Sequence, residues 1–204
     1  MQPEFLPDHR ALVADVLARS NRELWRNLCE GADFAVDDLA GWQYQGLALG
    51  LPRWVERLTW KVFVKAFAHD ARGVHGWNVR MQQGGPQLCL PGADLQPTRR
   101  TSTLGGADPR TFGHYRVLPM AEWPRNLPSG LGKVGAMLDY GTGANPWLDP
   151  MRPMRDPLVA LQPGDPTCLL GWSYVELGPL RLPTPSYFLL VRWRPVDFVP
   201  AHVA

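Results

Sequence analysis

Residues 39–51, LAGWQYQGLALGL, form the stretch that decides the fold. Trp42 and Tyr44 alternate with Gln43 and Gln45, which is the period of a strand with one covered face. Glycines flank the two aromatic residues, and glycine inside a strand pattern is typical of the bends by which closed barrels turn corners. We therefore predict that this stretch is the first strand of a β-barrel.

A second stretch, residues 169–193 (LLGWSYVELGPLRLPTPSYFLLVRW), has the pattern of a hairpin that closes such a barrel. Closure pairs the two edge strands of the sheet, which would otherwise be exposed and prone to aggregation. The sequence predicts a mainly β protein with a single antiparallel β-barrel of about eight to ten strands. We place the barrel at residues 39–194 of one domain that covers residues 1–204.

The composition agrees with many short elements and turns, because the chain has 21 prolines and 20 glycines. The net charge of +2 and the lack of a basic run argue against a nucleic-acid partner. The N-terminus has no apolar run, so we expect no signal peptide and no membrane span. The three cysteines are far apart, which indicates free thiols in a reducing compartment. We expect a cytoplasmic protein.

Residues 8–30 are predicted to form one N-terminal helix, capped by Asp8 and ended by Gly31. Further strands are expected at residues 59–67, 76–81, 114–120, 134–141 and 157–161, and a short helix at residues 52–58. The turn-rich residues 84–111, with a possible strand at 88–90, are either a portal flap or a surface loop without a role. The tail, residues 195–204, is predicted to be disordered or loosely packed.

Residues 39–51 resemble the first strand of lipocalin-like proteins. They resemble more closely a bacterial family named for its Gly-x-Trp-x-Gly (GXWXG) motif. Trp42 stands at the first glycine of that motif and Tyr44 at its tryptophan. Trp60, Lys65 and Phe67 resemble the same family, as does the order MLDYG, MRD, PGD, LLG, YFLLVR over residues 134–194. The resemblance implies a small β-barrel and no particular activity, since the function of the family is unsettled.

Motifs for catalysis and for cofactors are missing from the sequence. There is no GxSxG, and GLGK at residues 130–133 follows Leu127 where a phosphate loop requires glycine. His69, Asp70 and His75 lie close together without a third strong zinc ligand nearby. We expect no catalytic residue of a known motif, no metal and no cofactor.

The polar set formed by Asp139, Tyr140, Asn145, Arg155 and Asp156 is the most informative one. A carboxylate at the end of an apolar strand is costly to bury unless it is paired, and Arg155 is the expected partner of Asp139. The pair is either structural or an anchor for an acidic head group.

The function expected from this fold is binding of a small hydrophobic molecule, such as a fatty acid or an isoprenoid, in the barrel interior. The candidate ligand-binding residues are Trp42, Tyr44, Trp77, His114, Tyr115, Asp139, Tyr140, Arg155 and Trp172. One alternative is an isomerase or cyclase of the same fold, with Asp139 or His114 as the acid–base group. Another is a non-catalytic protein-interaction module. The oligomeric state is left open.

Overall fold

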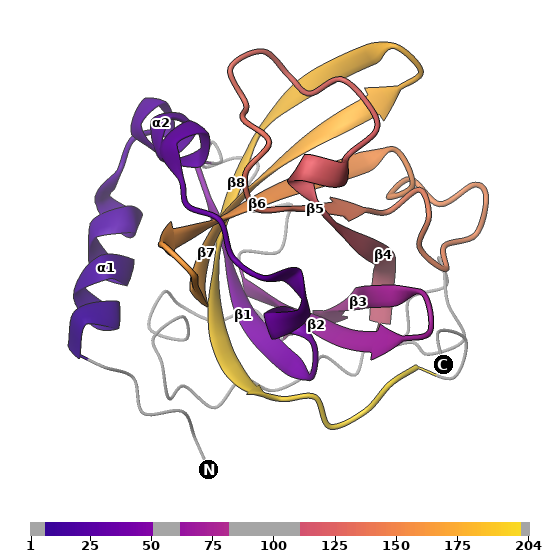
Figure 1. Cartoon of the computed structure of the whole chain (residues 1–204), viewed down its shortest axis with the longest axis horizontal. Coiled ribbons are helices and arrows are strands. Elements are labelled where there is room, and N and C mark those ends of the chain that lie inside the picture. The colour runs from indigo at the N-terminus through magenta and orange to yellow at the C-terminus, as the bar shows by residue number, and fades with distance from the viewer. Residues whose placement is uncertain (1–6, 51–61, 82–110, 201–204) are drawn as a thin grey trace.

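The computed structural model describes residues 7–50, 62–81 and 111–200. The predicted short helix at 52–58, the possible strand at 88–90 and the candidate portal flap at 84–111 fall on residues outside this description, apart from Thr111. The described residues form a closed antiparallel β-barrel with two helices on its outer side (Figure 1). The predicted fold class is thereby confirmed.

Eight strands follow one another around the barrel within the described residues, and each pairs with the next. Their bounds are Trp42–Leu49 (β1), Val62–Asp70 (β2), Gly73–Arg80 (β3), Thr111–Pro119 (β4), Ala136–Asp139 (β5), Met154–Gln162 (β6), Asp165–Leu177 (β7) and Leu180–Pro195 (β8). Two short 3-10 helices are Val36–Leu39 (η1) and Met120–Glu122 (η3).

The first and last strands close the barrel, as the two aromatic stretches predicted. β1 pairs with β8 in antiparallel register, with Leu47 opposite Leu189 and Leu49 opposite Tyr187. The long β7–β8 hairpin extends beyond the barrel wall and projects at the upper right of Figure 1. We call the barrel end from which this hairpin projects the hairpin end, and the opposite end, beside η1, the η1 end.

The predicted single helix over residues 8–30 is wrong, because the segment forms two helices, Pro7–Ala18 (α1) and Asn21–Glu30 (α2), and the predicted cap Asp8 lies inside α1. Ser20 breaks the helix by starting the second one as its N-cap. The Ser20 hydroxyl accepts a hydrogen bond from the Glu23 amide, and the Glu23 carboxylate accepts one from the Ser20 amide at 2.8 Å. This reciprocal capping box satisfies two backbone donors that a continuous helix would not leave free. The predicted end at Gly31 is confirmed.

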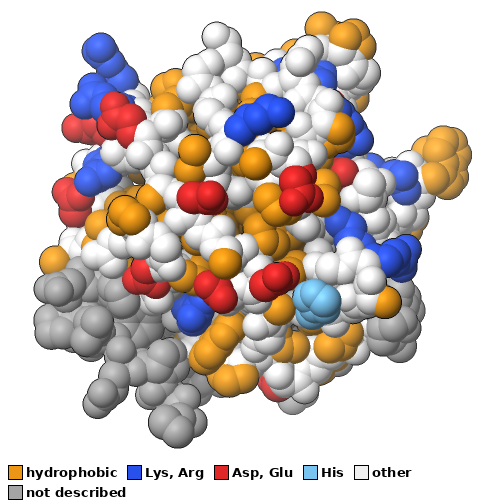
Figure 2. All heavy atoms as spheres, in the orientation of Figure 1, with side chains coloured by type: hydrophobic (Ala, Val, Ile, Leu, Met, Phe, Trp, Pro, Cys, Tyr) orange, Lys and Arg blue, Asp and Glu red, His pale blue; other side chains and the backbone are white. Residues whose placement is uncertain are grey.

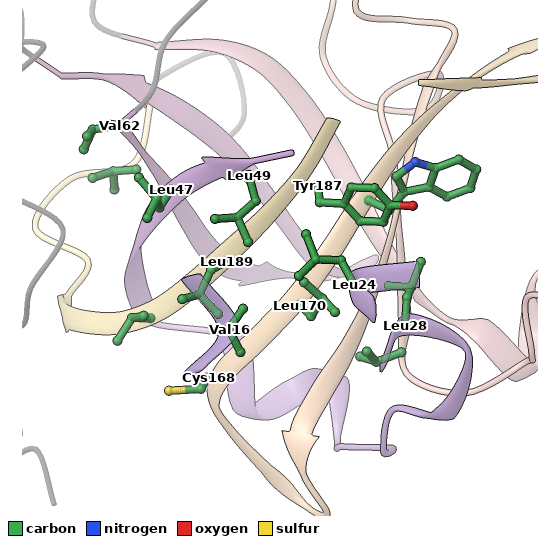
Figure 3. Close-up of a cluster of buried hydrophobic side chains, with 14 of the residues drawn as sticks. Val16, Leu24, Leu28, Leu47, Leu49, Val62, Cys168, Leu170, Tyr187 and Leu189 are labelled. Atoms are coloured by element: carbon green, nitrogen blue, oxygen red, sulfur yellow. The ribbon is translucent and has the colours of Figure 1, made fainter. Parts of the chain in front are cut away.

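The two helices pack their apolar residues against the outer face of the barrel. Figure 3 shows Val16 of α1 together with Leu24 and Leu28 of α2 beside Leu170 and Leu189 of the closing strands. All five side chains are buried. None of the described helices has the length and apolar character needed to cross a membrane.

Buried apolar side chains from the segment before β1 close the η1 end of the barrel. Phe34 and Leu39 are buried there and belong to the same apolar cluster as the inner strand residues. The segment before η1 is tied to the wall through two hydrogen bonds between Ala32 and Ala160, of 3.0 and 2.9 Å. A ligand therefore cannot enter the interior through this end without displacing buried side chains.

The chain after Pro195 is packed rather than loose, which corrects the prediction for its first residues. The Val196 amide donates to the Gly41 carbonyl at 2.8 Å, and the Gln43 side-chain amide donates to Asp197 at the same distance. The ring of Phe198 lies 6.0 Å from that of Trp77 on β3. The tail is ordered here because Trp77 faces outward, so that Phe198 can pack against its ring.

Candidate functional site

Aromatic rings from five different segments of the chain lie together in the barrel interior. Tyr44, Phe67, Tyr115, Tyr140 and Phe188 are all buried and share one cluster. Glycines on the same inner face make room for such rings. A Cβ at Gly171 would lie 2.2 Å from the Phe188 ring, and one at Gly46 would lie 2.2 Å from the Phe63 ring. Phe63 itself is only partly buried.

Within this aromatic interior lies a polar group that we call the Lys65 centre. Its members are Lys65 of β2, Asn78 of β3, Tyr140 after β5, Asp156 of β6 and Ser173 of β7. The side chains of Lys65 and Asp156 are only 3% and 5% exposed. Strand alternation explains the placement, because every second residue of a barrel strand faces inward.

The amine of Lys65 donates to three acceptors inside the barrel. Nζ lies 3.0 Å from Asn78 Oδ1, 2.6 Å from the Tyr140 hydroxyl oxygen and 3.3 Å from Asp156 Oδ2. The Tyr140 hydroxyl in turn donates to the same Asp156 oxygen at 2.8 Å. Ser173 donates to the other carboxylate oxygen at 2.7 Å. The amine, the phenol and the carboxylate thus form one connected hydrogen-bond network.

Four aromatic rings surround the amine nitrogen of Lys65. The ring centroids of Tyr115, Tyr140, Phe188 and Phe63 lie 4.9, 5.2, 5.3 and 5.6 Å from Nζ. A cation gains stabilisation from aromatic faces within about 6 Å, more so when water is excluded. The rings therefore stabilise a positive charge at this nitrogen while they keep water from it.

Burial dominates the protonation chemistry of the centre. It lowers the pKa of Lys65, since the charged amine loses its hydration, while the Asp156 carboxylate and its hydrogen bond act in the opposite direction. Burial also raises the pKa of the Tyr140 phenol well above its ordinary value, and the neighbouring Asp156 raises it further. Tyr140 is therefore a neutral donor at physiological pH.

Asn145 fixes the segment that carries Tyr140. Its side-chain amide donates to the carbonyl oxygens of Tyr140 and His114 at 2.8 and 2.5 Å, and it accepts from the His114 backbone amide at 2.8 Å. Asn78 holds the same part of β4 by donating to the Gly113 carbonyl at 2.9 Å. These side chains connect β3, β4 and the loop after β5, so that the Tyr140 hydroxyl is aimed at Lys65.

Three of the residues predicted to bind a ligand lie in the interior. Tyr140 belongs to the Lys65 centre, and the ring of Tyr115 lies beside its amine. Tyr44 lies nearer the η1 end, where its hydroxyl accepts a hydrogen bond from Arg192 at 3.1 Å, and burial raises its pKa to about 12. Trp42 is partly buried at the same end, with the Arg192 guanidinium 5.0 Å from its ring.

The other predicted residues are not brought to this interior site. Trp77 and Trp172 belong to the outer apolar cluster. Trp172 lines an outer groove of about 550 Å³ together with Trp25 and Tyr187. His114 is buried on β4, where Asn145 binds its backbone.

The predicted pairing of Asp139 with Arg155 is confirmed, and it is part of a larger ion-pair network. Arg155 Nη1 lies 3.2 Å from Asp139 Oδ1, and its Nε lies 3.0 Å from Glu176 Oε2. Arg181 and Arg125 also bind Glu176. Arg155 and Asp156 are adjacent on β6, so their side chains point to opposite faces of the wall. The network therefore lies outside the barrel and does not touch the Lys65 centre.

Sequence reasoning missed Lys65, Asn78 and Ser173 as candidate site residues. The available signal was that Lys65 interrupts the apolar run VFVKAF, where an inward-facing lysine of a closed barrel is expensive to bury. The predicted polar set joins Asp156 to Asp139, Tyr140, Asn145 and Arg155. Asp156 contacts Tyr140 of this set, and its other partners are Lys65 and Ser173.

His75, in the first hairpin, lies close to the carboxylate of Asp70. His75 Nδ1 lies 3.5 Å from Asp70, and Arg116 binds Asp70 through two hydrogen bonds of 2.8 and 2.7 Å. Burial lowers the pKa of His75. Across the described part of the chain, no three His, Cys, Asp or Glu side chains gather in a way that could hold a metal ion.

No protein-family model matches the chain, and neither a curated protein nor a solved structure matches it. The residues of the Lys65 centre therefore carry the functional inference by their own chemistry.

Proposed function

We propose that this protein binds a small, largely hydrophobic molecule inside the barrel, with the polar end of the molecule at the Lys65 centre. The observation that supports this most is the buried amine of Lys65 within four aromatic rings. Burying an ion pair is often no better for stability than an apolar core. Ionisable groups placed in this way are common at functional sites.

The hairpin end supplies the route to the site. The η1 end is closed by Phe34 and Leu39, whereas Phe63 and Ala48 at the opposite end are only partly buried. Phe63 directly overlies the amine, with its centroid 5.6 Å from Nζ. The ligand reaches Lys65 by moving this ring, and its apolar part then contacts Phe63 and Phe188.

The charge of the centre selects the polar end of the ligand. Lys65 and Asp156 already neutralise each other at 3.3 Å, so an additional buried anion would lack a partner. A neutral oxygen acceptor instead replaces one of the three hydrogen bonds of the amine. This favours an alcohol, a carbonyl compound or a protonated acid over an ionised fatty acid.

The test is native mass spectrometry of protein purified without detergent, followed by titration with isoprenoid alcohols and long-chain acids. We expect one ligand per chain and a rise in the free energy of unfolding of about 2.7 kcal/mol at a hundredfold excess over Kd. Lys65→Met should weaken binding of the alcohol, whereas Lys133→Met, at an exposed position, should not. The absence of saturable binding to the unmodified protein would refute the proposal.

A protein-interaction module is the second candidate, and it is supported by exposed apolar side chains at the hairpin end. Trp147 and Leu148 are 80% and 71% exposed, and Leu177 and Leu180 are at least half exposed. Figure 2 shows hydrophobic side chains at both protrusions on the upper right, over the hairpin and the β5–β6 loop. Sedimentation of the protein and of the Trp147→Ser, Leu148→Ser variant tests for self-association through this surface. A monomer at all concentrations would contradict self-association through it.

A further inference from the structure

We propose that Lys65 forms an imine with the carbonyl carbon of an apolar aldehyde or ketone in the barrel. This inference rests on the proposed function and narrows its ligand class to carbonyl compounds. It is carried by the geometry of three groups: the Lys65 amine, the Tyr140 hydroxyl 2.6 Å away and the Asp156 carboxylate 3.3 Å away.

An amine attacks a carbonyl carbon only in its neutral form, and the interior makes that form more accessible than it is in water. Burial lowers the pKa of Lys65, which is the usual way in which proteins make a lysine nucleophilic. Asp156 is placed to accept the proton that the amine gives up. Tyr140 donates its hydroxyl to the same Asp156 oxygen at 2.8 Å and connects the two groups.

The reaction balances with these groups alone. The ammonium of Lys65 transfers one proton to Asp156, and the freed nitrogen lone pair forms a bond to the carbonyl carbon. The carbonyl oxygen takes up the proton that the nitrogen loses, which gives a neutral carbinolamine. Asp156 then returns its proton to the hydroxyl group, the carbon–oxygen bond breaks and water leaves. The products are a protonated imine, an ionised Asp156 and one water molecule.

The groups around Lys65 stabilise the protonated imine as well as allowing the amine to attack the carbonyl carbon. A protonated imine is a cation, so it takes over the contacts of the ammonium with the rings of Tyr115, Tyr140 and Phe188. It also keeps Asp156 as its counter-ion. The rings exclude water from the nitrogen, which slows hydrolysis of the imine.

The lysine content of the chain makes the inference easy to test. The sequence has three lysines, at positions 61, 65 and 133, and Lys133 is exposed. A Lys61→Arg, Lys133→Arg variant therefore retains Lys65 as its lone lysine. We would incubate this variant with decanal and sodium cyanoborohydride, which reduces an imine to a stable secondary amine, and map the modified peptide by mass spectrometry. Decan-1-ol serves as the matched ligand that cannot form an imine.

We expect one decyl group on Lys65, competition by decan-1-ol, and loss of the modification in Lys65→Arg. Arginine keeps the positive charge but does not form this imine under the same conditions. Mapping on the variant that retains Lys65 gives the answer even if Lys65→Arg does not fold. Decanal that binds reversibly in native mass spectrometry without modification of Lys65 would overturn the imine and leave the proposed binding function standing. Failure of both decanal and decan-1-ol to bind would overturn both.

Discussion

Lys65 Nζ and Asp156 Oδ2 lie 3.3 Å apart inside a closed barrel, on strands β2 and β6, which do not pair with each other. Strand-to-strand hydrogen bonds therefore do not explain their contact, which crosses the interior. Tyr140 bridges the two groups with hydrogen bonds of 2.6 and 2.8 Å. This pair places two ionisable groups in an interior that apolar side chains could fill.

Removing both members of this pair should cost less than the sum of the two single removals. Lys65→Met leaves the Asp156 carboxylate buried without its cation, and Asp156→Asn leaves the amine without its anion, so each should cost about 3–5 kcal/mol of unfolding free energy. The double variant should lose less than the sum, because neither charge remains. Urea denaturation of the four proteins measures the coupling. Additive losses within about 0.5 kcal/mol would contradict an energetic link between the two groups.

Arg155 should matter more for stability than its partner Asp139. Arg155 binds both Asp139 and Glu176, whereas loss of Asp139 still leaves it Glu176 at 3.0 Å. We expect about 3–5 kcal/mol for Arg155→Met and about 1–3 kcal/mol for Asp139→Asn, measured by urea denaturation. Arg19→Met, which removes a more exposed pair with Asp15, is the control and should cost about 1 kcal/mol or less. Equal losses for Arg155 and Arg19 would refute the ranking.

We predict that position 171 must be glycine because the ring of Phe188 leaves no room for a side chain there. A Cβ at this position would lie 2.2 Å from Phe188 Cζ, so Gly171→Ala must push the ring away from its place. We expect a loss of about 1–3 kcal/mol from overpacking. Phe188→Leu in the same chain should recover part of that loss, because the shorter side chain vacates the space. Thermal unfolding of both variants decides, and no recovery in the double variant would locate the strain elsewhere.

Ser20 should determine the stability of α2. Ser20→Ala removes the acceptor for the Glu23 amide and should cost about 1 kcal/mol, whereas Ser20→Thr keeps a hydroxyl and should cost less. Chemical denaturation with detection by circular dichroism measures both. If the two variants are equally stable, the hydroxyl is not the stabilising group.

Asp70 should make the protein sensitive to acid. The hydrogen bonds from Arg116 hold the pKa of this carboxyl well below its ordinary range. A carboxyl whose pKa is depressed by folding stabilises the protein above its unfolded pKa of about 4, and this contribution is lost as the pH falls below that value. Asp70→Asn should therefore flatten the decrease of unfolding free energy between about pH 5 and about pH 2. The exposed Asp15→Asn is the control. An unchanged slope in Asp70→Asn would contradict the prediction.

The sequence alone was enough to predict the barrel and its closure. Alternation in residues 39–51 and in the segment before Pro195 identifies strands with a covered face, and that pattern is local. The partnership of Asp139 with Arg155 could also be predicted, because both lie at ends of neighbouring strands in a meander. Features that depend on residues close together in the chain, or on adjacent strands, can therefore be predicted from the sequence pattern.

Only the tertiary structure decided which face of each strand is inside. Trp77 and Trp172 were candidates for a ligand site, but both face outward, while Asn78 and Ser173 beside them reach the Lys65 centre. The alternation of residue types along a strand shows that its two faces differ. Where both faces are buried, this alternation does not show which face points into the barrel. The β3–β4 and β7–β8 pairings are also irregular at these same positions, where the additional residues lie on β4 and β8. The Lys65–Asp156 contact spans 91 residues and exists because the closed barrel brings the inner faces of β2 and β6 together.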